Sequence, residues 1–271
     1  MTRTQFRYRQ RVNRCRSFGG AAQFAAFVLG CLLVGASAPA AASEAPFTGT
    51  WAILKVLSDS ATFPLVGELA RTSTLIQRAA IVQTGSLLTL SATYCSTEFD
   101  NGSALRTTVD QAFARSLAPI VLQATLDGTS DPELLTQSWS TELHGVRLEN
   151  PETDPLPTYA GDPRVFDQDG DGKPGITVRA CALGAITGDV YVVERLRTQL
   201  VGAVVSLNRI EGRVEGSVEQ VILGATNALF LGAMVSRPDP VATNSFFVLQ
   251  RVDSTWACDD ILAQRVAVFG R

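Results

Sequence analysis

The stretch Ile210-Glu-Gly-Arg-Val-Glu-Gly-Ser-Val-Glu-Gln-Val-Ile222 decides the fold class. Aliphatic residues and glycines alternate in it with charged and polar residues, which is the period of a β-strand that has one dry and one wet face. Gly212 and Gly216 lie on the dry face, where glycine leaves room for a bulky neighbour or lets the strand bend. The stretch predicts a long antiparallel strand in a strongly curved sheet.

The same alternation recurs along the chain, and long helical periodicity is scarce. Further strands are expected at about 48–56, 72–82, 87–95, 105–109, 120–126, 138–148, 176–183, 190–205 and 244–252. Tight turns are expected at 84–86 and 100–103. Asp110 is expected to cap a short helical turn before Pro119, and a second short helix is expected over 257–266. We therefore predict an all-β fold, an antiparallel barrel or sandwich of about nine or ten strands with one or two short helices.

Residues 1–42 have the order of a bacterial secretory signal peptide. Six arginines and no acidic residue occupy the first sixteen positions, and an apolar segment (18–35) and a small-residue run (36–43) follow. Small residues at Ala40 and Ala42 place the cleavage point before Ser43. An uncleaved anchor, which needs about 20 apolar residues, and lipidation of Cys31 are the alternatives. We expect an exported protein in the periplasm, the cell envelope or the medium, with no membrane-spanning segment after cleavage.

The charge of the remaining chain excludes several classes of function. Beyond the arginine-rich start, 17 basic residues stand against 26 acidic ones, so the body lacks the basic footprint of a nucleic-acid-binding protein. His144 is the only histidine, which excludes a multi-histidine metal centre. No nucleophile-elbow, zinc or Ser-His-Asp motif is present. We do not expect an enzyme; a hydrolase that works through paired carboxylates is the least favoured hypothesis.

Residues 43–271 are expected to form one β-rich domain, interrupted at 149–175 by a proline-rich linker and an acidic loop. Export would leave three cysteines, which allow one disulfide and one free thiol. We favour a bridge between Cys95 and Cys258, because both flank predicted strand ends whereas Cys181 lies within a strand.

Asp167-Gln-Asp-Gly-Asp-Gly-Lys-Pro-Gly175 is the stretch with the clearest chemistry. Carboxylates at Asp167, Asp169 and Asp171, followed by glycine, can curl around a hard cation, and the backbone carbonyl of Lys173 would be the next oxygen. The pattern resembles the Asp-x-Asp-x-Asp-Gly calcium loops of FG-GAP/VCBS repeats and EF-hands. That resemblance implies a Ca²⁺ site that runs directly into a β-strand.

The loop departs from these families at two ligand positions, where Gly175 and Val178 replace acidic residues. Water or a remote carboxylate must therefore complete the coordination, and Asp162, Asp154 and Glu152 are the nearest candidates. Incomplete ligation implies weak binding, with a dissociation constant of about 10⁻⁴ to 10⁻³ M and a structural role for the ion. The alternative is a solvated acidic turn without an ion.

Phe47-Thr-Gly-Thr-Trp51 resembles the start of the first strand of lipocalins and related calycins. The resemblance implies a closed barrel with an internal apolar cavity, and an arginine of the last strand, here Arg251, that packs over the tryptophan. An ordinary core tryptophan is the alternative. Over most of its length the chain also resembles a group of exported bacterial β-rich proteins, which implies no activity.

Three functional hypotheses follow from the sequence. The first is a non-catalytic exported β-domain with one structural calcium loop, which acts as a structural or binding module of the cell envelope or the medium. The second is a calycin-like carrier of a small apolar ligand, and the third is the secreted hydrolase. The physiological partner and the oligomeric state do not follow from the sequence.

Overall fold

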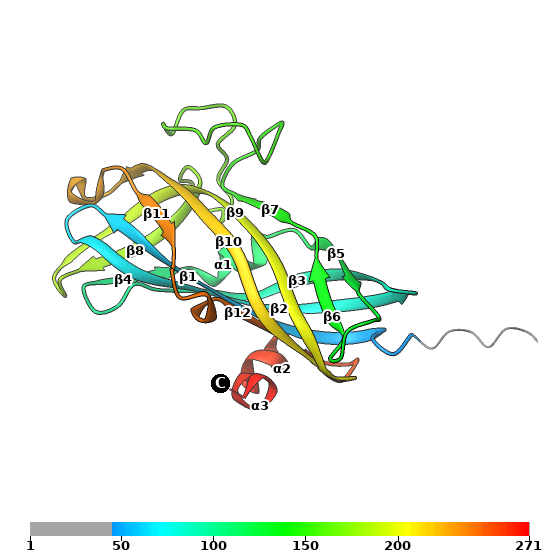
Figure 1. Ribbon diagram of the computed structural model, residues 1–271. Coiled ribbons are helices and arrows are strands. Elements are labelled where there is room, and N and C mark those ends of the chain that lie inside the picture. The colour runs from blue at the N-terminus through cyan, green and yellow to red at the C-terminus, as the bar shows by residue number, and fades with distance from the viewer. Residues whose placement is uncertain (1–44, 271) are drawn as a thin grey trace, which may run out of the picture. The chain divides into compact units, whose positions relative to one another are not determined.

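A computed structural model describes residues 45–270 and shows an all-β protein (Figure 1). Within these residues the strands are β1 Gly49–Phe63, β2 Gly67–Thr84, β3 Leu87–Asp100, β4 Leu105–Val109, β5 Ile120–Leu126, β6 Leu134–Gln137, β7 Ser140–His144, β8 Ile176–Ala182, β9 Ile186–Ser206, β10 Arg209–Ala225, β11 Val235–Pro238 and β12 Phe246–Arg251. The helices are α1 Gln111–Ser116, α2 Cys258–Ala263 and α3 Arg265–Phe269, with 3₁₀ turns η1 Ala228–Phe230 and η2 Ala242–Asn244. The predicted fold class is confirmed.

The strands form one antiparallel, ring-like sheet. Hydrogen-bonded neighbours run in the order β10, β12, β1, β2, β3, β5, β6 and β9, and β9 also pairs with β10. Along its other edge β9 pairs in turn with β8, β7 and β6, while β4 extends from β8 and β11 pairs with β1. The structure therefore has twelve strands where about nine or ten were expected. The two missed strands, β6 and β11, have four residues each, which is too short to show alternation.

The core fills the inside of the ring. Along β1, Trp51, Ile53 and Leu57 point inward and join a hydrophobic cluster to which strands from all parts of the ring contribute. The alternate residues of β1 point outward and are buried beneath α2 and α3, where Ile261 and Phe269 cover them. Because both faces of this part of β1 are covered, its residues 51–57 are apolar except for Lys55 and show little alternation.

The strand from which the fold was predicted is β10, and its dry face lines the interior. Gly212 lies opposite Gly202 of β9. A Cβ atom at Gly212 would lie 2.2 Å from the carbonyl oxygen of Val201 and 2.8 Å from the ring of Phe247. The two glycines therefore make room for that phenyl ring, as the pattern predicts.

Several boundaries differ from the prediction. The strands expected at 48–56 and 72–82 extend toward each other into a long hairpin, β1–β2, that turns at Pro64–Val66. The strand expected at 138–148 ends at His144, because Gly145 takes a left-handed conformation with φ of +69°. The turns at 84–86 and 100–103, and the α1 cap from Asp110, are as predicted. The predicted terminal helix consists of two short helices.

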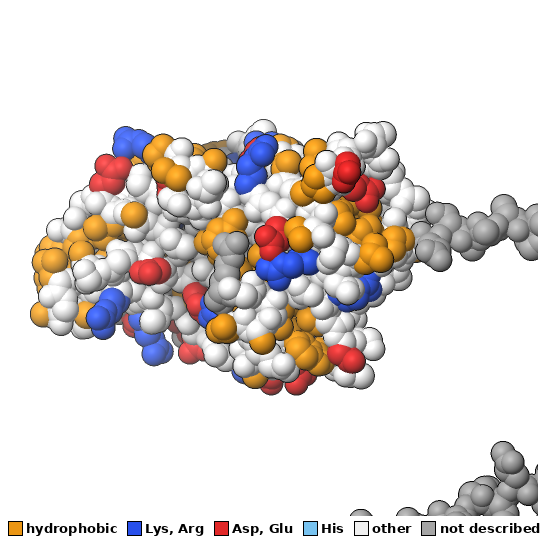
Figure 2. Space-filling model, turned by 60° about the horizontal axis from the view of Figure 1, so that its bottom comes forward, with side chains coloured by type: hydrophobic (Ala, Val, Ile, Leu, Met, Phe, Trp, Pro, Cys, Tyr) orange, Lys and Arg blue, Asp and Glu red, His pale blue; other side chains and the backbone are white. Residues whose placement is uncertain are grey.

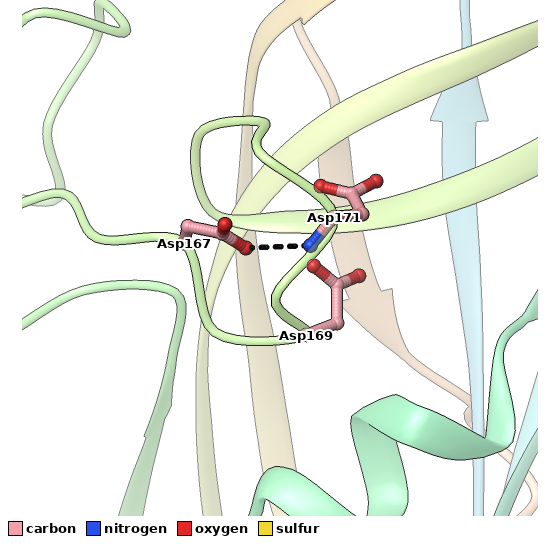
Figure 3. Close-up of side chains that lie close together, drawn as sticks. All are labelled: Asp167, Asp169 and Asp171. Carbon is pink, nitrogen blue, oxygen red and sulfur yellow. Dashed lines mark hydrogen bonds between the residues drawn. The ribbon is translucent and has the colours of Figure 1, made fainter.

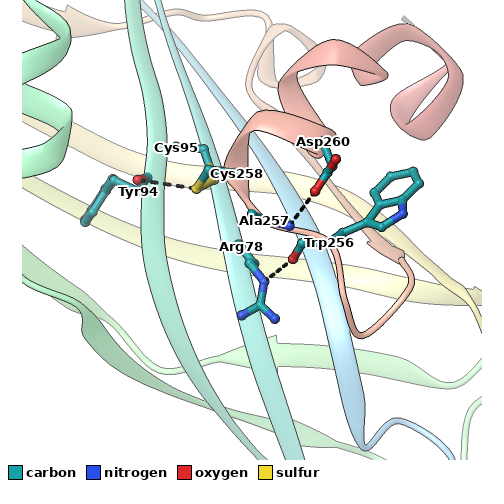
Figure 4. Close-up of a disulfide and its surroundings, with 7 residues drawn as sticks. All are labelled: Arg78, Tyr94, Cys95, Trp256, Ala257, Cys258 and Asp260. Carbon is teal, nitrogen blue, oxygen red and sulfur yellow. Dashed lines mark hydrogen bonds between the residues drawn. A yellow bond between two sulfur atoms is a disulfide. The ribbon is translucent and has the colours of Figure 1, made fainter.

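Cys95 of β3 and Cys258 of α2 form a disulfide bond, as the sequence predicts (Figure 4). The bridge attaches α2 to the ring at the point where the helix covers the outer face. Arg78 of β2 adds a second attachment, since its Nε donates to the carbonyl oxygen of Trp256 at 2.6 Å. Cys181 of β8 is a free thiol.

Among residues 45–270, no helix is long and apolar enough to cross a membrane. The signal peptide predicted for residues 1–42, and the alternative lipidation of Cys31, lie outside the described residues.

Candidate functional site

The aspartate loop lies between β7 and β8, at the end of the irregular segment 149–175. A short parallel bridge between Asp167 and Gly175 closes the neck of the loop, where the amide of Gln168 donates to the carbonyl oxygen of Gly175 at 3.0 Å. Gly175 is essential to this neck, because a Cβ atom there would lie 2.2 Å from the carbonyl oxygen of Val192. The loop then runs directly into β8, as predicted.

The structure brings the three predicted carboxylates together. One oxygen from each of Asp167, Asp169 and Asp171 lies within 4.8 Å of the other two (Figure 3). Calcium binds oxygen at 2.3–2.6 Å, so two ligands on opposite sides of one ion lie about 4.6–5.2 Å apart. The spacing of the three oxygens is therefore compatible with a single Ca²⁺.

Backbone amides of the loop hold two of these carboxylates in place. Asp167 accepts hydrogen bonds from the amides of Gly170 (2.8 Å), Asp171 (3.2 Å) and Gly172 (2.8 Å). Asp171 accepts from the Lys173 amide at 2.8 Å and from the Thr177 hydroxyl at 2.7 Å. These hydrogen bonds within the loop fix its shape and hold the carboxylates of Asp167 and Asp171 near each other.

Asp169 has an oxygen that the described residues leave without a partner. Its Oδ2 accepts from the amide of Thr177 at 2.9 Å, whereas its Oδ1 is buried and accepts no hydrogen bond from residues 45–270. Burial raises the pKa of Asp169, and the charges of Asp171 and Asp167 raise it further. A cation between the three carboxylates would satisfy the Oδ1 atom and remove the repulsion.

The other predicted ligands are placed differently. The Lys173 amide bonds within the loop, and its side chain is exposed. Asp162 is paired with the guanidinium of Arg164 at 2.8 Å, which lowers the pKa of Asp162. Asp154 accepts from the amide of Asn150 at 2.9 Å. Neither these carboxylates nor that of Glu152 belongs to the group around the loop. Beyond the oxygens of the loop itself, which include the carbonyl of Lys173, water is therefore the remaining source of ligands.

A second candidate site is a hollow inside the ring, which sequence reasoning did not locate. It has a volume of about 50 Å³. Its apolar lining consists of Phe63, Pro64, Phe99, Leu105, Val178, Ala180, Val190, Val192, Ile222, Phe230 and Met234, and its polar lining of Arg71, Asn101, Thr107 and Gln220. These residues come from seven strands and three connecting segments, so no local sequence pattern marks them.

Buried ion pairs lie inside the ring, and one of their members, Arg71, lines the hollow. Arg71 donates through Nε to Oδ1 of Asp59 at 2.8 Å, and Lys55 pairs with Glu142 at 3.2 Å. Tyr94 donates to the other oxygen of Glu142. The charge of the Arg71 guanidinium, which lines the hollow, is therefore balanced by Asp59. The rest of the lining is mostly apolar, so the hollow offers an uncharged ligand an apolar wall and no unpaired charge.

His144 also belongs to this interior. Its Nδ1 lies 2.9 Å from Oε1 of Glu194, both side chains are buried, and the ring of Phe113 meets the imidazole edge-on at 5.3 Å. His144 is thus a buried, hydrogen-bonded histidine.

Arg251 packs over Trp51, with the guanidinium carbon 4.7 Å from the ring centroid. The two residues are partners across β1 and β12. The arginine also donates to the carbonyl oxygens of Thr48, at 2.8 Å, and Pro46. This contact closes the end of the ring that lies away from the hollow.

Comparisons of the chain with protein-family models, curated proteins and solved structures gave no match.

Proposed function

We propose that this protein is a non-catalytic, exported β-domain that holds one structural Ca²⁺ in the loop 167–175, and that it acts as a structural or binding module of the cell envelope or the medium. The observation that carries the calcium proposal is the convergence of three carboxylates around the partnerless Oδ1 of Asp169. Asp167, Asp169 and Asp171 would supply side-chain oxygens, the carbonyl of Lys173 would supply a fourth, and water would complete the shell.

The expected effect of calcium on stability follows from weak binding. For a dissociation constant of about 0.1–1 mM, about 10 mM Ca²⁺ adds roughly 1.4–2.7 kcal/mol to the free energy of unfolding. For a domain of this size each kcal/mol raises the melting temperature by about 2–4 °C. The melting temperature should therefore rise by about 3–11 °C.

Calorimetric melting in EDTA and in about 10 mM CaCl₂ tests the proposal. Asp169→Asn should abolish the calcium response without lowering the melting temperature in EDTA, because it removes a carboxylate whose ionisation is unfavourable in the ion-free loop. Asp259→Asn, which removes an equal charge from exposed α2, should respond to calcium as the unmodified protein does. Equal melting temperatures with and without calcium would refute the calcium site and show that the loop is a plain acidic turn.

A second candidate function is the binding of a small apolar ligand in the hollow, which its apolar lining supports. About 50 Å³ is far below the roughly 300–1,000 Å³ of drug-sized pockets, so a slender hydrocarbon group suits it and a polycyclic ligand does not. Trp51 does not line the hollow, so its emission is a poor reporter of binding.

A calorimetric titration with 1-octanol tests this second function. We expect saturable binding that Ala180→Leu abolishes by filling the hollow, while Ala70→Leu, an exposed change on β2, leaves it intact. Failure of the unmodified protein to bind 1-octanol would refute the carrier proposal. The hydrolase hypothesis has the least support, because the buried carboxylates Glu142 and Glu194 are already paired with Lys55 and His144.

A further inference from the structure

Asn101 gives the hollow a hydrogen-bond acceptor that the described residues do not use. The residue follows β3, is 3% exposed and belongs to the polar lining of the hollow. Its Nδ2 donates to Oγ1 of Thr107 at 2.6 Å, whereas its Oδ1 is buried and accepts no hydrogen bond from residues 45–270. A buried acceptor without a partner destabilises the folded state. A ligand that donates to this oxygen would therefore gain affinity.

The other buried polar groups of the lining have partners. Nη1 of Arg71 donates to Oε1 of Gln220 at 3.3 Å, and Asp59 accepts from Nε of the same guanidinium at 2.8 Å. The hydroxyl oxygen of Thr107 accepts from Asn101. Among the buried side-chain oxygens and nitrogens of the lining residues, Oδ1 of Asn101 is therefore the atom left for a ligand.

The chemistry of this atom decides which ligand group fits. An amide oxygen accepts hydrogen bonds and donates none, so the ligand must supply an O–H or N–H donor. Carboxylate and ether oxygens also only accept, so neither satisfies Oδ1. An ammonium group donates, but it would bring an unpaired charge into an apolar wall, because Asp59 is already paired with Arg71. A neutral hydroxyl is the smallest group that meets these conditions.

The surroundings of Asn101 favour an uncharged ligand with a hydrocarbon chain. Phe99 of β3 and Leu105 of β4, which lie close to Asn101 in the chain, line the hollow as well. A chain attached to the hydroxyl would therefore meet apolar surface at once. Basic and acidic side chains are interspersed on the face of the molecule in Figure 2, so that face has no field of one sign to attract a charged ligand.

We propose that the hollow selects neutral aliphatic alcohols, whose hydroxyl donates to Oδ1 of Asn101 while an unbranched chain lies against the apolar lining. The Thr107 hydroxyl, which can rotate, would donate to the ligand oxygen. The proposal rests on the second candidate function, to which it adds the chemical group that the ligand must carry.

Calorimetric titration with 1-octanol and with its isomer 1-methoxyheptane tests the proposal, because the ether has the same atoms but no donor. We expect the unmodified protein to bind the alcohol about tenfold more tightly than the ether, the effect of one hydrogen bond. Asn101→Leu should weaken 1-octanol binding to the level of the ether and leave ether binding unchanged. The control Asn208→Leu makes the same change at an exposed residue of the β9–β10 turn and should keep the preference for the alcohol.

The outcomes separate this inference from the second candidate function. If neither ligand binds, the hollow is not a ligand site and both are wrong. If alcohol and ether bind equally well, the hollow is a carrier site and the inference about the hydroxyl alone is wrong. An alcohol preference that survives Asn101→Leu, or tighter binding of octanoate than of 1-octanol, also overturns the role of Asn101. The comparison of alcohol with ether needs no variant, so it decides the question even if Asn101→Leu fails to fold.

Discussion

The bridge between Cys95 and Cys258 should contribute a large part of the stability of the protein. We consider the double variant Cys95→Ala with Cys258→Ala. The bridge closes a loop of 163 residues, and the chain-entropy relation gives about 5 kcal/mol at 25 °C for a loop of that length. The value is an upper bound, because residual structure in the unfolded chain reduces it.

The assay is urea unfolding followed by circular dichroism, which reports the strands. We expect the free energy of unfolding to fall by about 3–5 kcal/mol, which corresponds to roughly 6–20 °C in melting temperature. Cys181→Ala is the matched control, since it removes the free thiol and leaves the bridge in place. In a protein that consists of residues 43–271, which has three cysteines, three titratable thiols in the untreated, denatured sample would show that the bridge is absent.

A second measurement tests whether the bridge acts on the whole ring or on the terminal helices alone. Limited proteolysis at 252–257, the segment that joins β12 to α2, detects local release of α2 and α3. Cleavage there with an unchanged urea midpoint of the strands would refute the loop-closure reasoning. The bridge would then only fasten α2 over the outer face of β1.

Three further outcomes are expected. Gly212→Ala should lower the free energy of unfolding by about 3 kcal/mol or more in urea titrations, because the new Cβ atom would collide with backbone atoms. The control is Gly224→Ala, which should be tolerated because its Cβ atom would lie 3.3 Å from a tyrosine side chain. Arg251→Lys should lower the free energy of unfolding by about 1–2 kcal/mol in the same assay, since lysine cannot both stack over Trp51 and donate to two carbonyl oxygens as the planar guanidinium does. An unchanged urea midpoint would contradict this. Stability should also fall as the pH drops below about 4, because a lowered carboxyl pKa gives stability that is present above the ordinary pKa and is lost as the group becomes protonated. Hydrogen bonds lower the pKa of Asp127, Asp154, Asp162, Asp239 and Asp253. Asp162→Asn should reduce the fall of the urea midpoint with decreasing pH. An equally steep fall in this variant and in the unmodified protein would show that Asp162 does not contribute to it.

Local patterns predicted those parts of the molecule that depend on neighbouring residues. Each of three features is formed by residues only a few positions apart in the sequence: the alternation in β10, the Asp110 cap and the aspartate loop. The pairing of Cys95 with Cys258 was also predicted, because strand ends and strand interiors are distinguishable in sequence.

Features assembled from distant strands could not be predicted. The lining of the hollow comes from seven strands, and the partner of His144 lies 50 residues away on β9. The sequence also did not show that the candidate carboxylates Asp162 and Asp154 lie outside the aspartate group, where each has a partner close in the chain, Arg164 and Asn150. Periodicity indicates which face of a strand is dry, but it contains no information about which strands face each other.

The position of β1 between β2 and β12 has a consequence for how the chain must be made. β1 pairs with β12 through Trp51 and Arg251, which are separated by 200 residues, so the ring closes only after the chain has been made as far as residue 251. Contacts between such distant segments form slowly. A nascent chain that lacks residues 246–251 leaves the long edges of β1 and β10 open to pair with other chains. Products that end before residue 246 should therefore aggregate, whereas the chain that includes β12 has both edges paired.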